Sequence, residues 1–207
     1  MRTCLLPLSL AATLAVAAAA RASEAPASPA AVGQPAPGFT LKDLDGKEFK
    51  LADLAGKKVV LEWFNPDCPF IRFAHTKGDL KDQGGRLQAK GVVFLAVNSS
   101  APGREGNGLE RNREAKKEYA IPYPVLLDED GTVGRLYGAR TTPHIFRIDE
   151  KGVLRYRGAI DNAPFGEVRG GDKKLNYLDQ ALEALARGAA VDPAETGSYG
   201  CGVKYAK

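Results

Sequence analysis

Short apolar runs alternate with polar and glycine-rich segments along most of the chain. Residues 58–64 form a continuous β-branched and aromatic run, and residues 92–100 form a second one. Runs of this kind are typical of strands that are covered on both faces of a sheet. Further strands are predicted at residues 124–128, 144–149 and 153–158, the last antiparallel to its predecessor across a tight turn.

Helical segments separate these strands. Residues 70–90 are predicted to be mostly helical, with a break or bend at their internal glycines, and residues 109–120 form a charged, solvated helix. A short helix is expected at 133–137 and an amphipathic one at 175–187, with Leu178, Leu182 and Leu185 on one stripe. Near the start, residues 39–41 and 48–51 flank an Asp-Gly turn, which predicts a β-hairpin. Alternation of this kind indicates an α/β protein with a central sheet between helices.

The two ends of the chain have a different composition from the middle. Arg2, the apolar stretch that follows it and the Ala20-Arg21-Ala22 site are typical of a cleaved secretory signal. The segment after it is rich in alanine, proline and serine, which favours a flexible leader. We therefore predict a signal peptide (1–22), a flexible leader (23–33), one domain (34–190) and a C-terminal tail that carries Cys201 (191–207).

Charge and composition narrow the classes of function. The full chain has 29 basic and 25 acidic residues. The predicted signal removes two arginines and no acid, so the mature chain is close to charge balance. There is no basic stripe with interleaved aromatic residues, which argues against nucleic acid as a partner. The signal's apolar core is short, and we expect no stable membrane insertion after its cleavage. The predicted location is the periplasm or the extracellular medium.

Cys68 is the main candidate for chemistry, because it stands where the run 59–64 ends and a helix is expected to begin. Pro69 suits the first helical position, which places Cys68 at or beside the N-cap. Free backbone N–H groups and the helix dipole favour a thiolate there. Asp67 opposes this effect, since a neighbouring carboxylate disfavours a second negative charge. The alternative is an inert buried thiol, which is common for free cysteine.

Two further features accompany Cys68. Pro143, in TTPHIFRID, precedes a β-rich run, which fits either a cis peptide bond or the start of an edge strand. The other cysteine of the mature chain is Cys201, in the glycine-flanked tail YGCGVKY. In an oxidising compartment it is expected to resolve an adduct on Cys68, to form a permanent disulfide, or to pair with another chain. A long separation in sequence is no obstacle, because loop-closure entropy grows slowly with length.

Three features together resemble the thioredoxin fold: the order of elements, the strand-to-cysteine turn NPDCPFI and the proline-led strand. The redoxin branch of that fold is resembled by the segment GQPAPGFTLKDLDGKEFKLADLAGKKVVLEWF. That branch includes the alkyl hydroperoxide reductase/thiol-specific antioxidant type and peroxiredoxin-like thioredoxin-family proteins. The resemblance implies a three-layer α/β sandwich, with a central mixed sheet, helices on both faces and an N-terminal β-hairpin extension.

The resemblance also implies roles for individual residues. Cys68 matches the attacking cysteine of the C-x-x-C motif, and Pro143 matches the cis-proline beside it. Pro69, Thr142 and Pro143 are then expected to bind substrate. The chain departs from the pattern twice. Ile71 stands where the second motif cysteine would be, and Asn65 stands where a peroxiredoxin has threonine, which weakens the case for a peroxidase.

Two functions from different classes follow. The first is a secreted or periplasmic thiol oxidoreductase, with Cys68 as nucleophile and Cys201 as resolving cysteine, which needs no cofactor. Its partners would be a disulfide-containing protein or a peroxide, together with an external thiol reductant. The second is a redox-inert or Cu(I)-binding protein that recognises a partner through the same groove. His75 and His144 are the histidines that would assist a thiolate in holding Cu(I).

Overall fold

A computed structural model describes residues 29–207 of the chain. The predicted signal peptide and the first part of the predicted leader lie outside the described residues. The end of that leader packs against the domain: the backbone N–H of Ala30 donates to Leu136, and that of Gly33 donates to Leu154. Within residues 29–207, no helix has both the length and the apolar character needed to span a bilayer.

A seven-stranded mixed sheet forms the centre of the molecule, in the order β2-β1-β5-β4-β3-β7-β8. The three inner strands β3, β4 and β5 are parallel, and each neighbour toward the two edges runs antiparallel to the strand it joins. The strands are β1 (Thr40–Asp43), β2 (Glu48–Lys50), β3 (Lys58–Trp63), β4 (Val92–Asn98), β5 (Val125–Leu127), β7 (His144–Ile148) and β8 (Leu154–Gly158). The predicted hairpin is therefore present, as an extension of the sheet beyond β5.

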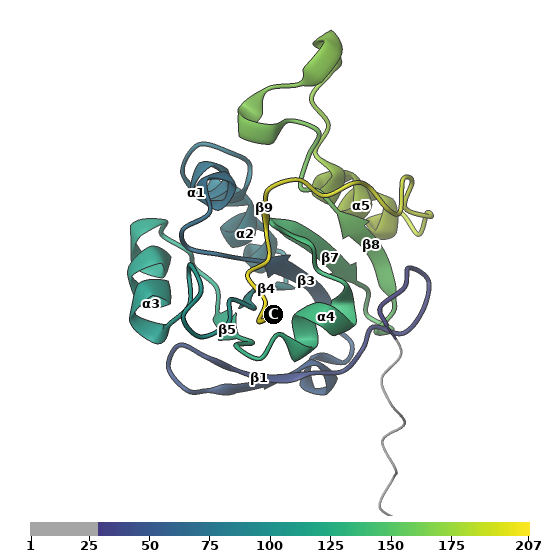
Figure 1. The fold of residues 1–207 in the computed structure, drawn as a ribbon. Coiled ribbons are helices and arrows are strands. Elements are labelled where there is room, and N and C mark those ends of the chain that lie inside the picture. Colours follow the sequence, from purple (N-terminus) through teal and green to yellow (C-terminus); the bar gives the residue numbers. More distant parts are fainter. Residues whose placement is uncertain (1–28) are drawn as a thin grey trace, which may run out of the picture.

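Helices cover both faces of this sheet (Figure 1). Buried apolar side chains of α1, α2, α3 and α5 lie in one apolar cluster, and two of α4, Val133 and Tyr137, lie in a second cluster on the other face. The helices are α1 (Pro69–Thr76), α2 (Leu80–Ala89), α3 (Leu109–Glu118), α4 (Thr132–Tyr137) and α5 (Tyr177–Ala186). Three short 3-10 turns lie at Leu51–Leu54, Pro164–Gly166 and Arg169–Gly171. The predicted three-layer sandwich is thus confirmed.

The two faces of β3 supply both clusters. Trp63 lies in the cluster beneath α4 and its Nε1–H donates to Ser99. Phe64, at the end of the strand, lies in the other cluster, together with Cys68. The stripe predicted on the last helix is shifted: α5 buries Leu178, Ala181 and Ala184 fully, and the two later leucines only in part.

The C-terminal tail contributes a small strand of its own. β9 (Cys201–Gly202) pairs antiparallel with β6 (Thr141–Thr142), with Cys201 opposite Thr142. Figure 1 shows this tail in yellow as it leaves α5, crosses the carboxyl end of β3 and ends beside α4. Residues more than fifty positions apart in sequence therefore meet at the start of α1.

Candidate functional site

Cys68 begins helix α1, as predicted. It is the N-cap residue, Pro69 follows at the first helical position, and no side chain caps the helix. The first backbone N–H groups of α1 therefore have no side-chain acceptor, and they favour negative charge on a sulfur at this end. Cys68 itself is 1% exposed. A group so well covered reacts with a substrate only if something above it moves.

Two neighbours cover the Cys68 sulfur. It lies 3.0 Å from the carbonyl oxygen of Thr142, to which the thiol donates, and 2.7 Å from Sγ of Cys201. Both cysteines are free thiols in this structure. A disulfide needs its sulfurs about 2.05 Å apart, so an oxidant that removes two electrons and two protons from the pair could join them with only a small movement. The candidate nucleophile and the candidate resolving cysteine are in direct contact.

The Cys201 thiol has a different environment. Burial and the adjacent Cys68 sulfur raise the pKa of the Cys201 thiol to about 12. Cys201 therefore remains a protonated thiol near neutral pH while the tail is in this position. Because a protonated thiol is a poor nucleophile, Cys201 is suited to the second step of a reaction and not to the first.

Thr142 and Pro143 form one wall of the site. The peptide bond between them is cis, as the resemblance implied, and both residues are buried under the tail. Thr142 accepts from the Cys68 thiol through its carbonyl, and its hydroxyl donates to the carbonyl of Cys201 over 3.4 Å. Pro69 follows Cys68 at the start of α1 and is exposed. Three of the residues expected to act together, Cys68, Cys201 and Thr142, are thus in direct contact.

The loop before Cys68 is held by residues that the sequence did not single out for this role. The side-chain oxygen of Asn65 accepts from the backbone of Asp67, and its amide donates to the Glu105 carbonyl. The Tyr119 hydroxyl donates to the Pro66 carbonyl over 2.8 Å. These contacts occupy Asn65 in bracing the loop, so its side chain does not serve Cys68 as a hydrogen-bond partner.

Asp67 is paired with a cation. Nε of Arg111, on α3, lies 2.7 Å from a carboxylate oxygen of Asp67, and the same guanidinium donates to the Pro66 carbonyl. We expected Asp67 to disfavour a Cys68 thiolate, and the adjacent arginine offsets much of that charge. The signal for this pairing, one basic residue among many on a charged helix, was too weak to read from sequence.

The tail is anchored on both sides of Cys201. The Tyr199 hydroxyl donates to Asp161 over 2.7 Å, and the Tyr205 hydroxyl donates to the carbonyl of Ala139 over 2.9 Å. The Tyr205 ring also lies under the guanidinium of Arg135, 4.5 Å from the ring centre. Residues 199, 201, 203 and 205 each make such contacts, so the period-two pattern YxCxVxY was a strand signal within the tail.

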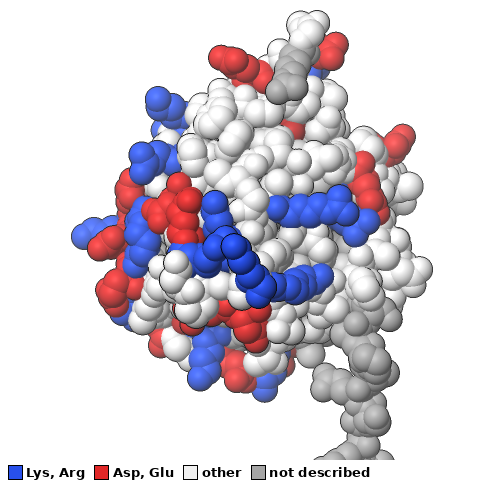
Figure 2. Space-filling model, in the orientation of Figure 1, with Lys and Arg blue, Asp and Glu red and all other residues white. Residues whose placement is uncertain are grey.

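Basic side chains contact the end of the tail. Figure 2 shows Lys and Arg side chains, with Asp and Glu side chains beside them, on the face on which the chain ends. Among the contacts of the tail, the Arg135 guanidinium donates to the carbonyl of Ala206. Lys204 is paired with Glu105 over 3.4 Å.

The ring nitrogens of His75 and His144 make contacts with other groups of the protein. Nε2 of His75 lies 2.8 Å from the buried carboxylate of Glu62, which also accepts from Tyr123. Nδ1 of His144 accepts from the backbone N–H of Arg140. Among residues 29–207, no three or more His, Cys, Asp and Glu side chains gather in a way that could hold a metal ion.

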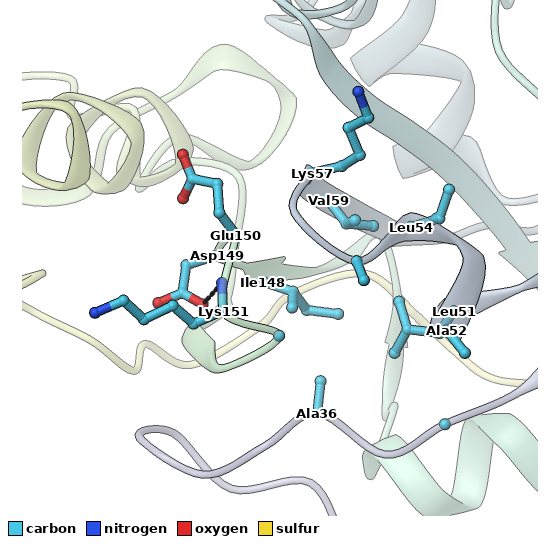
Figure 3. Close-up of a pocket in the computed structure, with 13 residues that line it drawn as sticks. Ala36, Leu51, Ala52, Leu54, Lys57, Val59, Ile148, Asp149, Glu150 and Lys151 are labelled. Carbon is cyan, nitrogen blue, oxygen red and sulfur yellow. Dashed lines mark hydrogen bonds between the residues drawn. The ribbon is translucent and has the colours of Figure 1, made fainter.

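An apolar pocket lies at the opposite end of β3 from the cysteines (Figure 3). It has a volume of about 340 Å³ and is lined by Val59, Ile148 and the 3-10 turn at Leu51–Leu54. Its polar groups belong mainly to the turn at Asp149, Glu150 and Lys151. No cysteine or histidine lines it, so thiol chemistry does not take place in this pocket.

Comparison with known proteins agrees with the site. The model of the AhpC/TSA family matches residues 32–157, which is more than half of the chain. A predicted peroxiredoxin, bcp, of Coxiella burnetii is 32% identical over 130 residues, which cover 63% of this chain and 81% of that protein.

Two solved structures are also similar. A hypothetical protein from Sinorhizobium meliloti 1021 is 27% identical, with a TM-score of 0.73, over 87% of this chain and 97% of that one. A predicted thiol:disulfide interchange protein, DsbE, from Chlorobium tepidum is 25% identical, with a TM-score of 0.57, over 75% of this chain and 97% of that one. The second of these bears a name that describes chemistry at paired sulfurs.

Proposed function

This chain belongs to the AhpC/TSA family, and on that basis we propose that it is a thiol oxidoreductase in which Cys68 reacts first and Cys201 second. The observation that carries the proposal is the contact of 2.7 Å between the two sulfurs at the start of α1. The order of reaction follows from the place of Cys68 at the N-terminus of α1 and from the raised pKa of Cys201.

The reaction with a disulfide substrate takes two exchange steps. The Cys68 thiolate attacks one substrate sulfur, a mixed disulfide forms, and the other substrate sulfur leaves as a thiolate. Cys201 then gives up its proton and attacks Sγ of Cys68. The remaining substrate sulfur leaves as a thiolate while the Cys68–Cys201 disulfide closes. Two electrons have passed to the substrate, and an external thiol reductant restores both protein thiols.

A peroxide is the second candidate oxidant, and the similarity to a predicted peroxiredoxin favours it. The Cys68 thiolate would attack one oxygen, release water or an alcohol, and become a sulfenic acid. The Cys201 thiol would condense with it to give the same disulfide and a second water. We place this reading second, because Asn65 stands at the position of the peroxiredoxin threonine and is occupied by the loop.

The location that we propose is the periplasm or the extracellular medium. It rests on the predicted signal peptide and leader, and it places two adjacent thiols in an oxidising compartment. Such a location requires the external reductant, since the pair otherwise stays oxidised. Pro69, Thr142 and Pro143 are proposed as the residues that line the path of the substrate to Cys68.

Two cysteine variants test the proposal. The reduced protein is mixed with a fluorescent disulfide-linked peptide and, separately, with hydrogen peroxide, and dithiothreitol serves as reductant. We expect Cys68→Ser to reduce turnover to the rate without enzyme. Cys201→Ser should still react once and retain the adduct on Cys68, which intact mass identifies. Turnover of Cys68→Ser at the wild-type rate would refute the proposal, and stoichiometric Cu(I) binding that depends on Cys68, without turnover, would favour the metal-binding alternative.

A further inference from the structure

The far end of the tail rests on α4, at a place that fits one aromatic ring (Figure 1). A Cβ atom at Gly131 would stand 2.6 Å from the ring of Tyr205, and one at Gly134 would stand 2.5 Å from its hydroxyl oxygen. A side chain at either position would therefore displace the ring. The two glycines leave the surface of α4 open where the ring lies.

Polar contacts hold the same ring. The guanidinium of Arg135 lies 4.5 Å from the ring centre and also donates to the carbonyl of Ala206 over 2.7 Å. A cation over an aromatic ring is attracted by the negative face of the ring. The Tyr205 hydroxyl donates to the Ala139 carbonyl over 2.9 Å. We call the group that receives the ring the Tyr205 seat: Gly131, Gly134, Arg135 and Ala139.

Cys201 lies between the Tyr205 seat and a second attachment at Thr196. The backbone N–H and the hydroxyl of Thr196 are hydrogen-bonded to the end of β8 and to the residue that follows it. One attachment thus joins the tail to the central sheet, and the other joins it to α4. Residues 197–204 form a strap between them, and this strap crosses over Cys68.

The two steps of the proposed reaction need this strap in opposite positions. Cys68 is 1% exposed with the tail in place, so the first step requires the strap to lift. An adduct on Cys68 then takes the place of the Cys201 sulfur, which lies 2.7 Å away in the reduced protein. The second step requires the strap to settle again until Cys201 reaches Sγ of Cys68. A contact that holds the strap down therefore opposes the first step and assists the second.

We propose that the Tyr205 seat sets the balance between the two steps, and that Arg135 is a positioning residue for the resolving cysteine. Among residues 29–207, no hydrogen bond joins Arg135 to either sulfur. It acts through the ring of Tyr205, whose contact with α4 determines how much of the time the strap covers Cys68. This inference rests on the proposed thiol chemistry and adds a residue to the machinery of that same site.

Reaction of the reduced protein with an equimolar amount of 2,2′-dithiodipyridine separates the two steps. The Cys68 thiolate attacks one sulfur of this disulfide, which forms a mixed disulfide and releases one thiopyridone. Cys201 then loses its proton and attacks Sγ of Cys68, which releases the second thiopyridone and closes the protein disulfide. Rapid mixing with detection by absorbance follows both releases. The probe is neutral, so a change in the charge of the protein does not alter its attraction.

Arg135→Met removes the cation over the ring and the bond to the Ala206 carbonyl. We expect the first release to be about 2- to 5-fold faster than in wild type and the second about 2- to 5-fold slower, because the open and closed fractions of the strap change by the factor that an exposed cation–π contact supports. Arg135→Lys keeps a cation and should return both rates toward wild type. Arg187→Met is the matched control, because Arg187 pairs with Glu183 of α5, and it should leave both rates unchanged.

Tyr205→Ala tests the same contact from the side of the tail. It should give the same pair of opposite changes, and Arg135→Met should add little to them, because both substitutions empty the same seat. This variant also keeps the test decisive if Arg135→Met folds poorly.

Wild-type rates of both releases in Arg135→Met would overturn the inference, as would a change of both rates in the same direction, which general loosening of the protein would produce. The proposed chemistry fails in a different way. If Cys68→Ser releases thiopyridone as fast as the wild type does in its first step, Cys201 reacts first and the proposed order is wrong, whatever the effect of Arg135. Two releases that depend on Cys68 but not on the Tyr205 seat would refute the inference alone.

Discussion

Cys68 and Cys201 lie side by side, but different parts of the molecule hold them there. Cys68 follows the central strand β3, begins α1 and belongs to the main apolar cluster. Cys201 belongs to a two-residue strand that is fixed by a few hydrogen bonds and close contacts of the tail. One sulfur thus depends on the global fold and the other on a local contact. The difference suits a pair in which one member stays in place while the other moves.

The largest effect on stability is expected from a substitution in the apolar cluster beneath Cys68. Ile71 is fully buried there, one turn into α1. Ile71→Ala should lower the free energy of unfolding by about 2–5 kcal/mol, because it removes buried methyl groups and leaves a cavity. Urea unfolding measures this loss. Leu109→Ala, at a position that is 38% exposed, is the control and should change stability by less than about 0.5 kcal/mol.

A comparable loss of unfolding free energy after Tyr205→Ala would contradict the proposed difference between the two sulfurs, because the tail would then belong to the same cooperative unit as the body of the protein. If instead Ile71→Ala left stability unchanged, the start of α1 would not depend on the core.

The second effect concerns the loss of stability at acid pH. Burial, with smaller contributions from Arg157 and Arg140, lowers the pKa of His144 to about 4. The unfolded chain binds a proton there near pH 6.5 and the folded chain does not, so stability falls as the pH drops from about 6.5 to about 4. The loss attributable to His144 approaches about 3 kcal/mol at the acid end of this window.

His144→Gln should flatten the stability profile between pH 6.5 and 4 relative to the wild type, as measured by urea unfolding at pH 7, 5 and 4. Because His144 is the first residue of β7, this titration weakens the central sheet. Parallel profiles for the variant and the wild type would exclude His144 as the source.

The unequal origins of the two sulfurs also explain what the sequence predicted. The place of Cys68 follows from local signals, namely an apolar strand, a polar turn and Pro69 at the first helical position. The hairpin and the inner strands follow from their apolar runs in the same way. The fold class and the candidate residues were therefore accessible before the structure.

The contacts of the tail were not accessible in this way. Strand β9 has two residues, and its pairing depends on Thr142, a residue 59 positions earlier in the chain. Gly200 is required only because the Thr142 carbonyl lies next to it. The same holds for the pair of Asp67 and Arg111, which are 44 residues apart. No local propensity encodes contacts of this range, although the alternation of Tyr199, Cys201, Val203 and Tyr205 did mark an extended segment.

A third effect separates charge from packing at Cys68. Arg111→Met leaves the Asp67 carboxylate without its partner and so disfavours negative charge on the nearby sulfur. Both groups are partly exposed, so we expect the rate of Cys68 alkylation to fall by less than about tenfold at low salt, and the difference to shrink near 1 M salt, where the Debye length is about 3 Å. Arg113→Met is the matched control on α3, because Arg113 pairs with Glu110 and Asp45 and not with Asp67. A loss that persists at high salt, or that Arg113→Met shares, would argue against a charge effect.

The smallest effect on stability is expected in the tail. It should nevertheless be detectable as a faster alkylation of the Cys201 sulfur. Tyr205→Phe removes only the hydrogen bond to the Ala139 carbonyl. The free energy of unfolding should fall by about 1 kcal/mol or less, a typical net value for one hydrogen bond. If the tail opens locally, Cys201 in the reduced protein should be alkylated faster, by up to about fivefold for a loss of this size. Alkylation of both cysteines at the same, global-unfolding rate in wild type and variant would mean that the tail does not open independently, and the two sulfurs would then be held by a single unit.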